Sequence, residues 1–222
     1  MLRFVPALTI ILMIGPVCAG LIGTILPAFG YLPALGGNRF SVGPWQDLLA
    51  QPGLGISMRL SLVNGLAATL ISLGVVVLFC AAWQGTRIFA VMQRLLSPIL
   101  SVPHAAAAFG LAFLIAPSGW IVRAIAPLGG WDRPPDIVTL QDPLGMALIV
   151  GLVVKETPFL LLMTLAALPQ ADADRTRKIA LTLGYGRVVG WLKTVLPRLY
   201  PQIRLPVLAV LAYSTSVVDV AM

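Results

Sequence analysis

Charged residues are scarce in this chain of 222 residues. Asp, Glu, Lys and Arg make up 10% of it, against about 25% in soluble domains. Hydrophobic residues make up 59%, and the mean hydropathy is +0.95. The few charges gather between long uncharged runs. This distribution excludes an ordinary soluble domain and is typical of a helical protein that crosses a membrane several times.

Histidine and cysteine are nearly absent. The chain has one histidine, His104, and two cysteines, Cys18 and Cys80, which both lie inside apolar runs. Without ligand-type neighbours, the cysteines are small apolar side chains rather than a disulfide or a metal pair. We therefore expect no metal site and no bound cofactor. We interpret His104 as a hydrogen-bonded packing residue more readily than as a ligand.

Acidic residues are also few. The chain has 8 acidic and 15 basic residues, which gives a net charge of +7. A basic balance can indicate nucleic-acid binding, but here the basic residues separate apolar segments and form no stripe on a polar domain. Composition therefore argues against a nucleic-acid partner.

Long apolar runs are what the chain does have. Five of them reach the roughly 20 residues that a membrane-spanning helix needs, at about 5–28, 60–83, 96–117, 146–168 and 203–222. The first continues to Leu26, which favours an uncleaved span over a signal peptide. The expected fold is all-α: a polytopic helical bundle in the lipid bilayer, with residues 1–222 as a single membrane domain.

Loop charges predict the orientation of these spans. Loops 84–95 and 169–202 together hold eight Lys and Arg residues, whereas loops 29–59 and 118–145 hold four. Because Lys and Arg accumulate on the cytoplasmic side, the N-terminus and loop 169–202 are expected to be cytoplasmic. The last apolar run, "LPVLAVLAYSTSVVDVAM", stops without a polar tail. We expect the chain to be the C-terminally incomplete part of something longer.

Loop 169–202 predicts two short helices on either side of Gly184. Asp172 or Asp174 is placed to cap the first helix through its side chain. The apolar side of that helix is expected to consist of Ile179, Ala180 and Leu183.

The second helix of the loop is expected to place Val188, Val189, Leu192 and Val195 on one side. Proline restricts the residue before it, so we expect Pro197 to end this helix.

This layout resembles the EAA loop of permease subunits of type I ABC importers. That pattern is Glu-Ala-Ala, three residues, Gly, nine residues, Ile, one residue, Leu-Pro. Ala180 stands at the second alanine, Gly184 at the glycine, and Leu196 and Pro197 at the final pair. In its overall pattern, the chain most resembles permeases of the type that carry thiamine, iron(III), sulfate or polyamines. Some of these are double-length, so the chain is expected to be the N-terminal half of a longer or fused permease.

Three positions depart from the family pattern. Lys178 stands at the glutamate, Ile179 at the first alanine and Thr194 at the isoleucine. A carboxylate that could pair with a basic group on a partner has therefore become a cation. Either this loop is the degenerate member of a pair, or the groove of the partner carries the opposite charge.

The resemblance implies a function without catalysis. Such a permease takes a small solute from an external, periplasmic solute-binding protein and passes it across the bacterial inner membrane. It works with a second permease half and with a dimer of cytoplasmic ATPase subunits. The loop 172–201 would couple to the ATPase, where ATP is bound. The chain itself has no glycine-rich phosphate loop.

Polar residues inside the spans are the remaining candidates. Charges at the bilayer centre are costly, so Lys155 and Glu156 should face the protein interior or a water path. They either line the translocation pathway or pair with another helix, and Asp219 in the last span has the same two interpretations. The alternatives to transport are a membrane-embedded enzyme that uses His104 with Asp219 or Glu156, and a structural subunit of an unrelated membrane complex.

Overall fold

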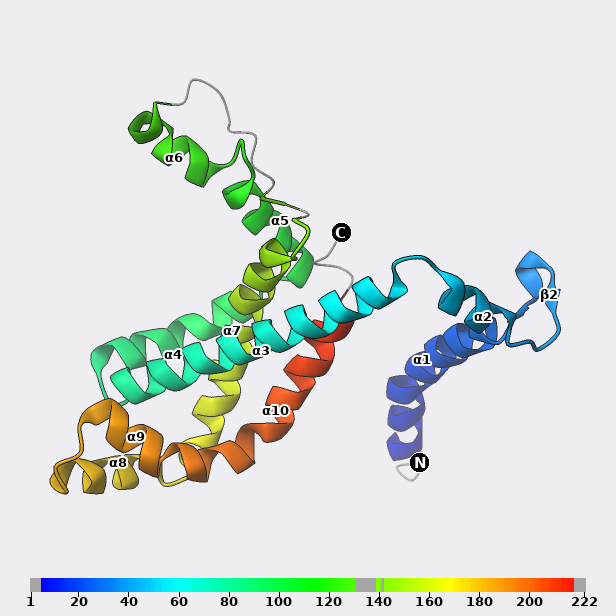
Figure 1. Cartoon of the computed structure of the whole chain (residues 1–222). Coiled ribbons are helices and arrows are strands. Elements are labelled where there is room, and N and C mark those ends of the chain that lie inside the picture. The colour runs from blue at the N-terminus through cyan, green and yellow to red at the C-terminus, as the bar shows by residue number, and fades with distance from the viewer. Residues whose placement is uncertain (1–4, 131–138, 141, 218–222) are drawn as a thin grey trace. The chain divides into compact units, whose positions relative to one another are not determined.

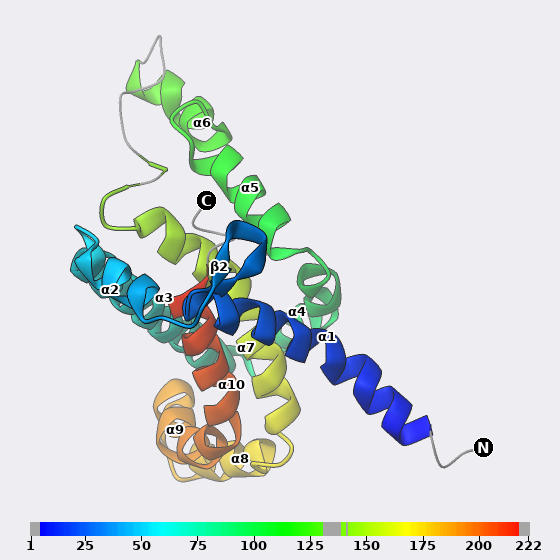
Figure 2. The same cartoon turned by 90° about the vertical axis from the view of Figure 1, so that its right-hand side faces the viewer.

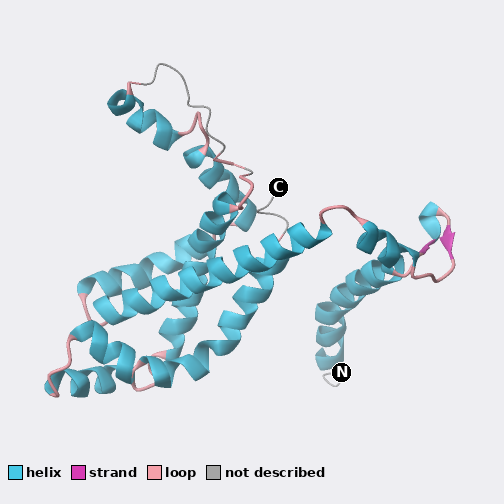
Figure 3. Ribbon diagram, in the orientation of Figure 1, coloured by secondary structure: helices cyan, strands magenta, loops and turns pink. Residues whose placement is uncertain are grey.

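The computed structural model is almost entirely helical, as Figure 3 shows. It describes residues 5–130, 139–140 and 142–217. The only strands among these residues are two short ones, β1 (Tyr31–Leu32) and β2 (Gly37–Asn38). The expected all-α class is confirmed.

The chain divides into two compact units, residues 1–58 and 59–222. The first contains α1 (Val5–Ala28), the antiparallel pair β1–β2, the short 3-10 helix η2 (Pro33–Leu35) and α2 (Gly43–Ala50). None of the described residues of α1 is buried within the structure. An uncharged and mostly apolar helix of 24 residues with this exposure suits a surface that faces lipid. The expectation of a single membrane domain stays a prediction.

The second unit is a helical bundle, coloured cyan to red in Figure 1. Its elements are α3 (Leu54–Trp83, which begins in the first unit), α4 (Arg87–Leu100), α5 (His104–Ile115), α6 (Trp120–Gly129), α7 (Met146–Ala167), α8 (Ala173–Thr182), α9 (Arg187–Thr194) and α10 (Leu196–Ser216).

Helix α7 lies at the centre of this unit and packs against α4, α5 and α10. The core around it includes Val76, Leu160, Trp191 and Leu199, all almost fully buried. Figures 1 and 2 both place α8 and α9 at one end of the unit and α5 and α6 at the other. The turn between α3 and α4 lies at the α8–α9 end. The two loops that the charge count assigns to one side of the membrane are therefore on one side of the bundle.

Among the described residues, four helical segments are long and apolar enough to cross a membrane: Val5–Ala28, Leu54–Trp83, His104–Gly129 and Met146–Ala167. The second begins at Leu54, six residues before the predicted 60. The fifth predicted span, 203–222, corresponds to the later part of α10, and its residues 218–222 lie outside the described residues.

The third predicted span, 96–117, is wrong as a continuous helix. Helix α4 ends at Leu100, and α5 begins at His104 after Pro103. Proline has no N–H to donate to the preceding turn, so the helix breaks there. The apolar segment found instead runs over 104–129, with a bend between α5 and α6.

Asp142 fixes the start of α7. Its carboxylate accepts hydrogen bonds from the backbone N–H groups of Met146, at 2.7 Å, and Ala147, at 3.0 Å. These donors have no partner within their own helix. The bonds, first of all that from Ala147, lower the pKa of Asp142.

Candidate functional site

The predicted coupling loop forms a helical hairpin, α8–α9, that connects α7 to α10. Its turn is closed by backbone hydrogen bonds from Gly184 N to Leu181 O and from Tyr185 N to Ala180 O, both 3.1 Å. This pair of bonds is the Schellman arrangement of a helix C-terminus. Gly184 has φ +84°, a conformation that residues with a side chain rarely adopt. The turn expected at Gly184 is confirmed.

Backbone conformation, rather than lack of space, is what requires glycine at 184. A Cβ atom built on Gly184 would meet no described atom within 4 Å. Gly186 is equally open but has φ −60°, which any residue adopts. Both glycines of the turn have open space around them, but only Gly184 has a positive φ, so Gly186 provides a matched control for Gly184.

The expected apolar side of α8 is split between two directions. Ala180 is buried against α9, whereas Ile179 and Leu183 are 50% and 71% exposed. At Gly190 an added Cβ would lie 3.2 Å from the Cβ of Ala180 and 3.1 Å from that of Tyr185. The grouping of Ala180 with Ile179 and Leu183 is therefore wrong. Ala180 holds the hairpin together, and the other two residues lie on its surface.

The second helix of the hairpin is divided in the same way. Val195 is fully buried, whereas Val189 is 49% exposed. Together with α8, this leaves six apolar residues exposed on the hairpin surface, and together we call them the outer apolar face: Ile179, Leu181, Leu183, Tyr185, Val188 and Val189. Lys178 is also exposed. The ammonium group of Lys193 lies 5.6 Å from the ring centre of Tyr185, a cation–π distance.

Leu196 and Pro197 begin α10 instead of ending α9. Helix α9 ends at Thr194, and Pro197 lies in the first turn of α10. A proline is tolerated there because the N–H groups of a first turn have no partner within the helix. The prediction that Pro197 ends the preceding helix is wrong, because the chain turns into the next helix at Val195, two residues before the proline.

The expected side-chain cap of α8 is also wrong. Asp172 occupies the N-cap position in a left-handed conformation, φ 48°, and makes no side-chain cap bond within the described part of the chain. Asp174 instead accepts a hydrogen bond from Gln84 Nε2 at 2.9 Å. Its carboxylate is thus used to attach α8 to the end of α3.

Sequence reasoning did not identify Gln84, which contacts both helices of the hairpin. Its Oε1 accepts from Trp191 Nε1 at 2.6 Å, and its backbone oxygen accepts from Arg187 Nη2 at 2.7 Å. Gln84 itself is 3% exposed. The available signal was a polar residue directly after a predicted span, but its partners lie about a hundred residues further along the chain.

Lys155 and Glu156 both contact the break between α4 and α5. The ammonium group of Lys155 donates to the backbone oxygen of Val102. Glu156 Oε1 lies 3.3 Å from His104 Nε2. The two charges are thus used between helices, and His104 has the hydrogen-bonding contact expected of it.

The cluster of Lys155, Glu156 and His104 is exposed on the side of the histidine. The side chains of His104 and Glu156 are 39% and 6% exposed, and the imidazole contacts the ring of Tyr213 in a tilted arrangement, with 5.0 Å between ring centres. Asp219, the third candidate for a pathway, lies outside the described residues. Among the residues that are described, no group of three or more His, Cys, Asp and Glu side chains could hold a metal ion.

Comparison with curated proteins finds a permease. The chain is 33% identical over 187 residues to the inner membrane ABC transporter permease protein YnjC of Escherichia coli strain K12. The aligned part is 82% of this chain, and the chain spans about a third (34%) of the length of that relative. No protein-family model and no solved structure matches the chain.

The similarity extends over most of the chain, well beyond the loop motif. It agrees with the apolar helices, which are those of a multi-pass inner membrane protein. Over four fifths of its length, this chain is a homologue of an ABC transporter permease, as the loop pattern indicated.

Proposed function

We propose that this chain is the membrane-spanning permease of an ATP-driven importer for a small solute. In this proposal it receives the solute from an external binding protein, works with a second permease half, and leaves ATP hydrolysis to a dimer of cytoplasmic ATPase subunits. Its support is the similarity to an ABC transporter permease together with the form of the α8–α9 hairpin.

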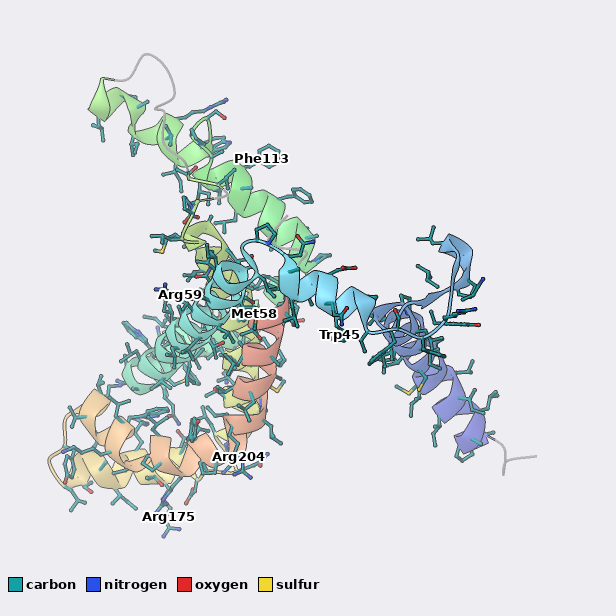
Figure 4. The ribbon with its side chains drawn as sticks, turned by 45° about the vertical axis from the view of Figure 1, so that its right-hand side comes forward. Trp45, Met58, Arg59, Phe113, Arg175 and Arg204 are labelled. Carbon is teal, nitrogen blue, oxygen red and sulfur yellow. The ribbon has the colours of Figure 1, made fainter. Side chains whose placement is uncertain are left out.

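The observation that carries the coupling proposal is the outer apolar face of the hairpin. Its side chains are exposed, whereas Ala180 lies against Gly190 between the two helices and Trp191 is buried in the core of the bundle. A rigid hairpin with exposed Leu183 and Val189 is suited to a groove on another protein, in which these side chains would be removed from water. Figure 4 shows the nearby Arg175 pointing away from the ribbon, where it can meet lipid phosphates or an acidic rim.

The pathway proposal concerns Lys155 and Glu156. Buried charges in a span normally face a protein interior or a water path. Here Lys155 and Glu156 are hydrogen-bonded to Val102 and His104, at the break between α4 and α5. The His104 side chain is partly exposed, so this cluster is accessible from one side. We place the translocation route beside this break. The same His104–Glu156 contact could also serve proton transfer in an enzyme, but the similarity to a permease favours transport.

Site-specific photocrosslinking tests the coupling surface. We would place a photoreactive residue at Leu183 on the hairpin, which is 71% exposed, or at Leu128, which is 90% exposed. Leu128 belongs to α6, the helix at the other end of unit 2. The expected result is a crosslink from position 183 to a subunit that mass spectrometry identifies as an ATP-binding protein, and none from position 128. Crosslinks from 183 to lipid alone would contradict the coupling role.

A further inference from the structure

Gln84 joins three helices at the α8–α9 end of the bundle. It follows Trp83, the last residue of α3, and its backbone N–H donates to Cys80 O at 3.0 Å, which continues the hydrogen bonding of α3. Its side chain donates to Asp174 on α8 and accepts from Trp191 on α9. Because Gln84 is 3% exposed, water cannot readily replace these bonds.

Two further contacts place the turn between α3 and α4 against the hairpin. The backbone oxygen of Gln84 accepts from Arg187. Gly85 has φ +79°, and a Cβ added to it would lie 3.0 Å from Arg177 Nη2. The α3–α4 turn is thus attached to both helices of a hairpin to which α3 is not adjacent in sequence.

Helix α3 is also held near its other end. Ser61 donates to the backbone oxygen of Thr215 in α10, and a Cβ added to Gly65 would lie 2.5 Å from Thr215 Cγ2. From Ser61 to Gln84 a helix extends roughly 35 Å at 1.5 Å per residue. A displacement of the hairpin would therefore reach the far end of the bundle through α3 as well as through α7 and α10.

We propose that Gln84 is a positioning residue that makes the α8–α9 hairpin and the adjoining end of α3 move as one body. This inference rests on the proposed function, in which a partner ATPase moves the hairpin. It adds α3 to the helices that are driven. The geometry supports a joint rather than ordinary packing, because one buried amide uses both its donor and its acceptor on two different helices.

An exchange of partners separates this role from a loss of folding. In Gln84→Glu the acceptor for Trp191 remains, but the donor to Asp174 is replaced by a second carboxylate. Adding Asp174→Asn again places an amide opposite a carboxylate. The amide at 174 can now donate to the carboxylate at 84, so the hydrogen bond can form in the opposite direction. Gln93→Glu on α4, an exposed position, is the matched control for the added charge.

The experiment uses the full chain purified with its copurifying ATPase, in a Cys18→Ala, Cys80→Ala background. Spin labels at Thr182 on α8 and Leu78 on α3, both exposed, report the distance between hairpin and helix. It is measured without nucleotide and after trapping with ATP and orthovanadate. We expect one narrow distance distribution that is the same in both states.

In Gln84→Glu we expect this distribution to broaden and to change on trapping, with ATP hydrolysis retained. We expect recovery in Gln84→Glu/Asp174→Asn and no change in Gln93→Glu. The joint is overturned if the parent distance itself changes on trapping, if Gln84→Glu leaves it narrow, or if the double variant does not recover. Failure of the proposed function is seen separately, as a parent chain that copurifies with no ATPase.

Discussion

Ala180 and Gly190 are in direct apposition across the α8–α9 hairpin. A single Cβ atom at Gly190 would lie 3.2 Å from that of Ala180, closer than side chains normally approach. The alanine of the loop motif is therefore an internal contact, and the two helices can be this close only because both residues are small. The outer apolar face depends on this contact for its position.

Enlarging Gly190 should loosen the hairpin. Gly190→Val must displace Ala180 or Tyr185, and overpacking of this kind costs about 1–3 kcal/mol. Hydrogen exchange of the amides in 180–191 should become faster in Gly190→Val and stay at the parent level in Gly186→Ala, an open position. Unchanged protection in the valine variant would show that the close packing is unimportant.

Gly184 should be sensitive to any side chain for a different reason. At φ +84° an L-residue costs roughly 1–2 kcal/mol although space is free. We expect Gly184→Ala to reduce, and Gly184→Leu to abolish, copurification of the ATPase, while the spans still insert. Gly186→Ala is the unstrained control. Full association of the leucine variant would mean that the loop is only a connector.

Lys178 should report the charge of the partner. It is exposed and occupies the position of the glutamate in the loop pattern. Lys178→Glu should strengthen association with the ATPase if the facing groove is basic, and weaken it if the groove is acidic. Binding measured at low and high salt should show the difference shrinking as salt screens it. A salt-independent affinity equal to that of the parent would remove Lys178 from the interface.

Glu156→Gln separates a pathway role from packing. The amide oxygen can still accept from His104, so the contact at the α4–α5 break should persist, whereas the charge is lost. We expect expression and thermal stability to stay near the parent values and solute uptake to fall. His104→Gln, in which an amide can replace the imidazole contact, is the companion variant. Undiminished uptake in Glu156→Gln would leave this group a purely structural role.

Acid should release the start of α7. The pKa of Asp142 is lowered by the N–H donors of Ala147 and Met146, so the ionised form stabilises the folded state. This stability is present at neutral pH and is lost as the pH falls below about 4, through the lowered pKa. Asp142→Ala should weaken the helix start by about 1 kcal/mol at neutral pH. Faster exchange at Met146 and Ala147, with no further acid effect in the variant, would be the signature.

The residues of the hairpin show where prediction from sequence succeeds. Gly184 was predictable because a left-handed turn needs glycine whatever surrounds it. The direction in which Ala180 points was not, because 3.6-residue periodicity does not say which side of a short helix meets its neighbour. The break at Pro103 was missed for a related reason: average hydropathy across 96–117 is insensitive to an interruption of backbone hydrogen bonding.

The sequence by itself determined the class of the protein, since long uncharged runs can bury their backbone polar groups in a bilayer only as helices. It also determined the place of the loop between α7 and α10. Only the tertiary structure decided the partners of Gln84 and Glu156, because Trp191 and His104 are distant along the chain and meet these residues only when the helices pack. Local propensity specifies where helices form, and packing specifies which of their polar groups are left to satisfy one another.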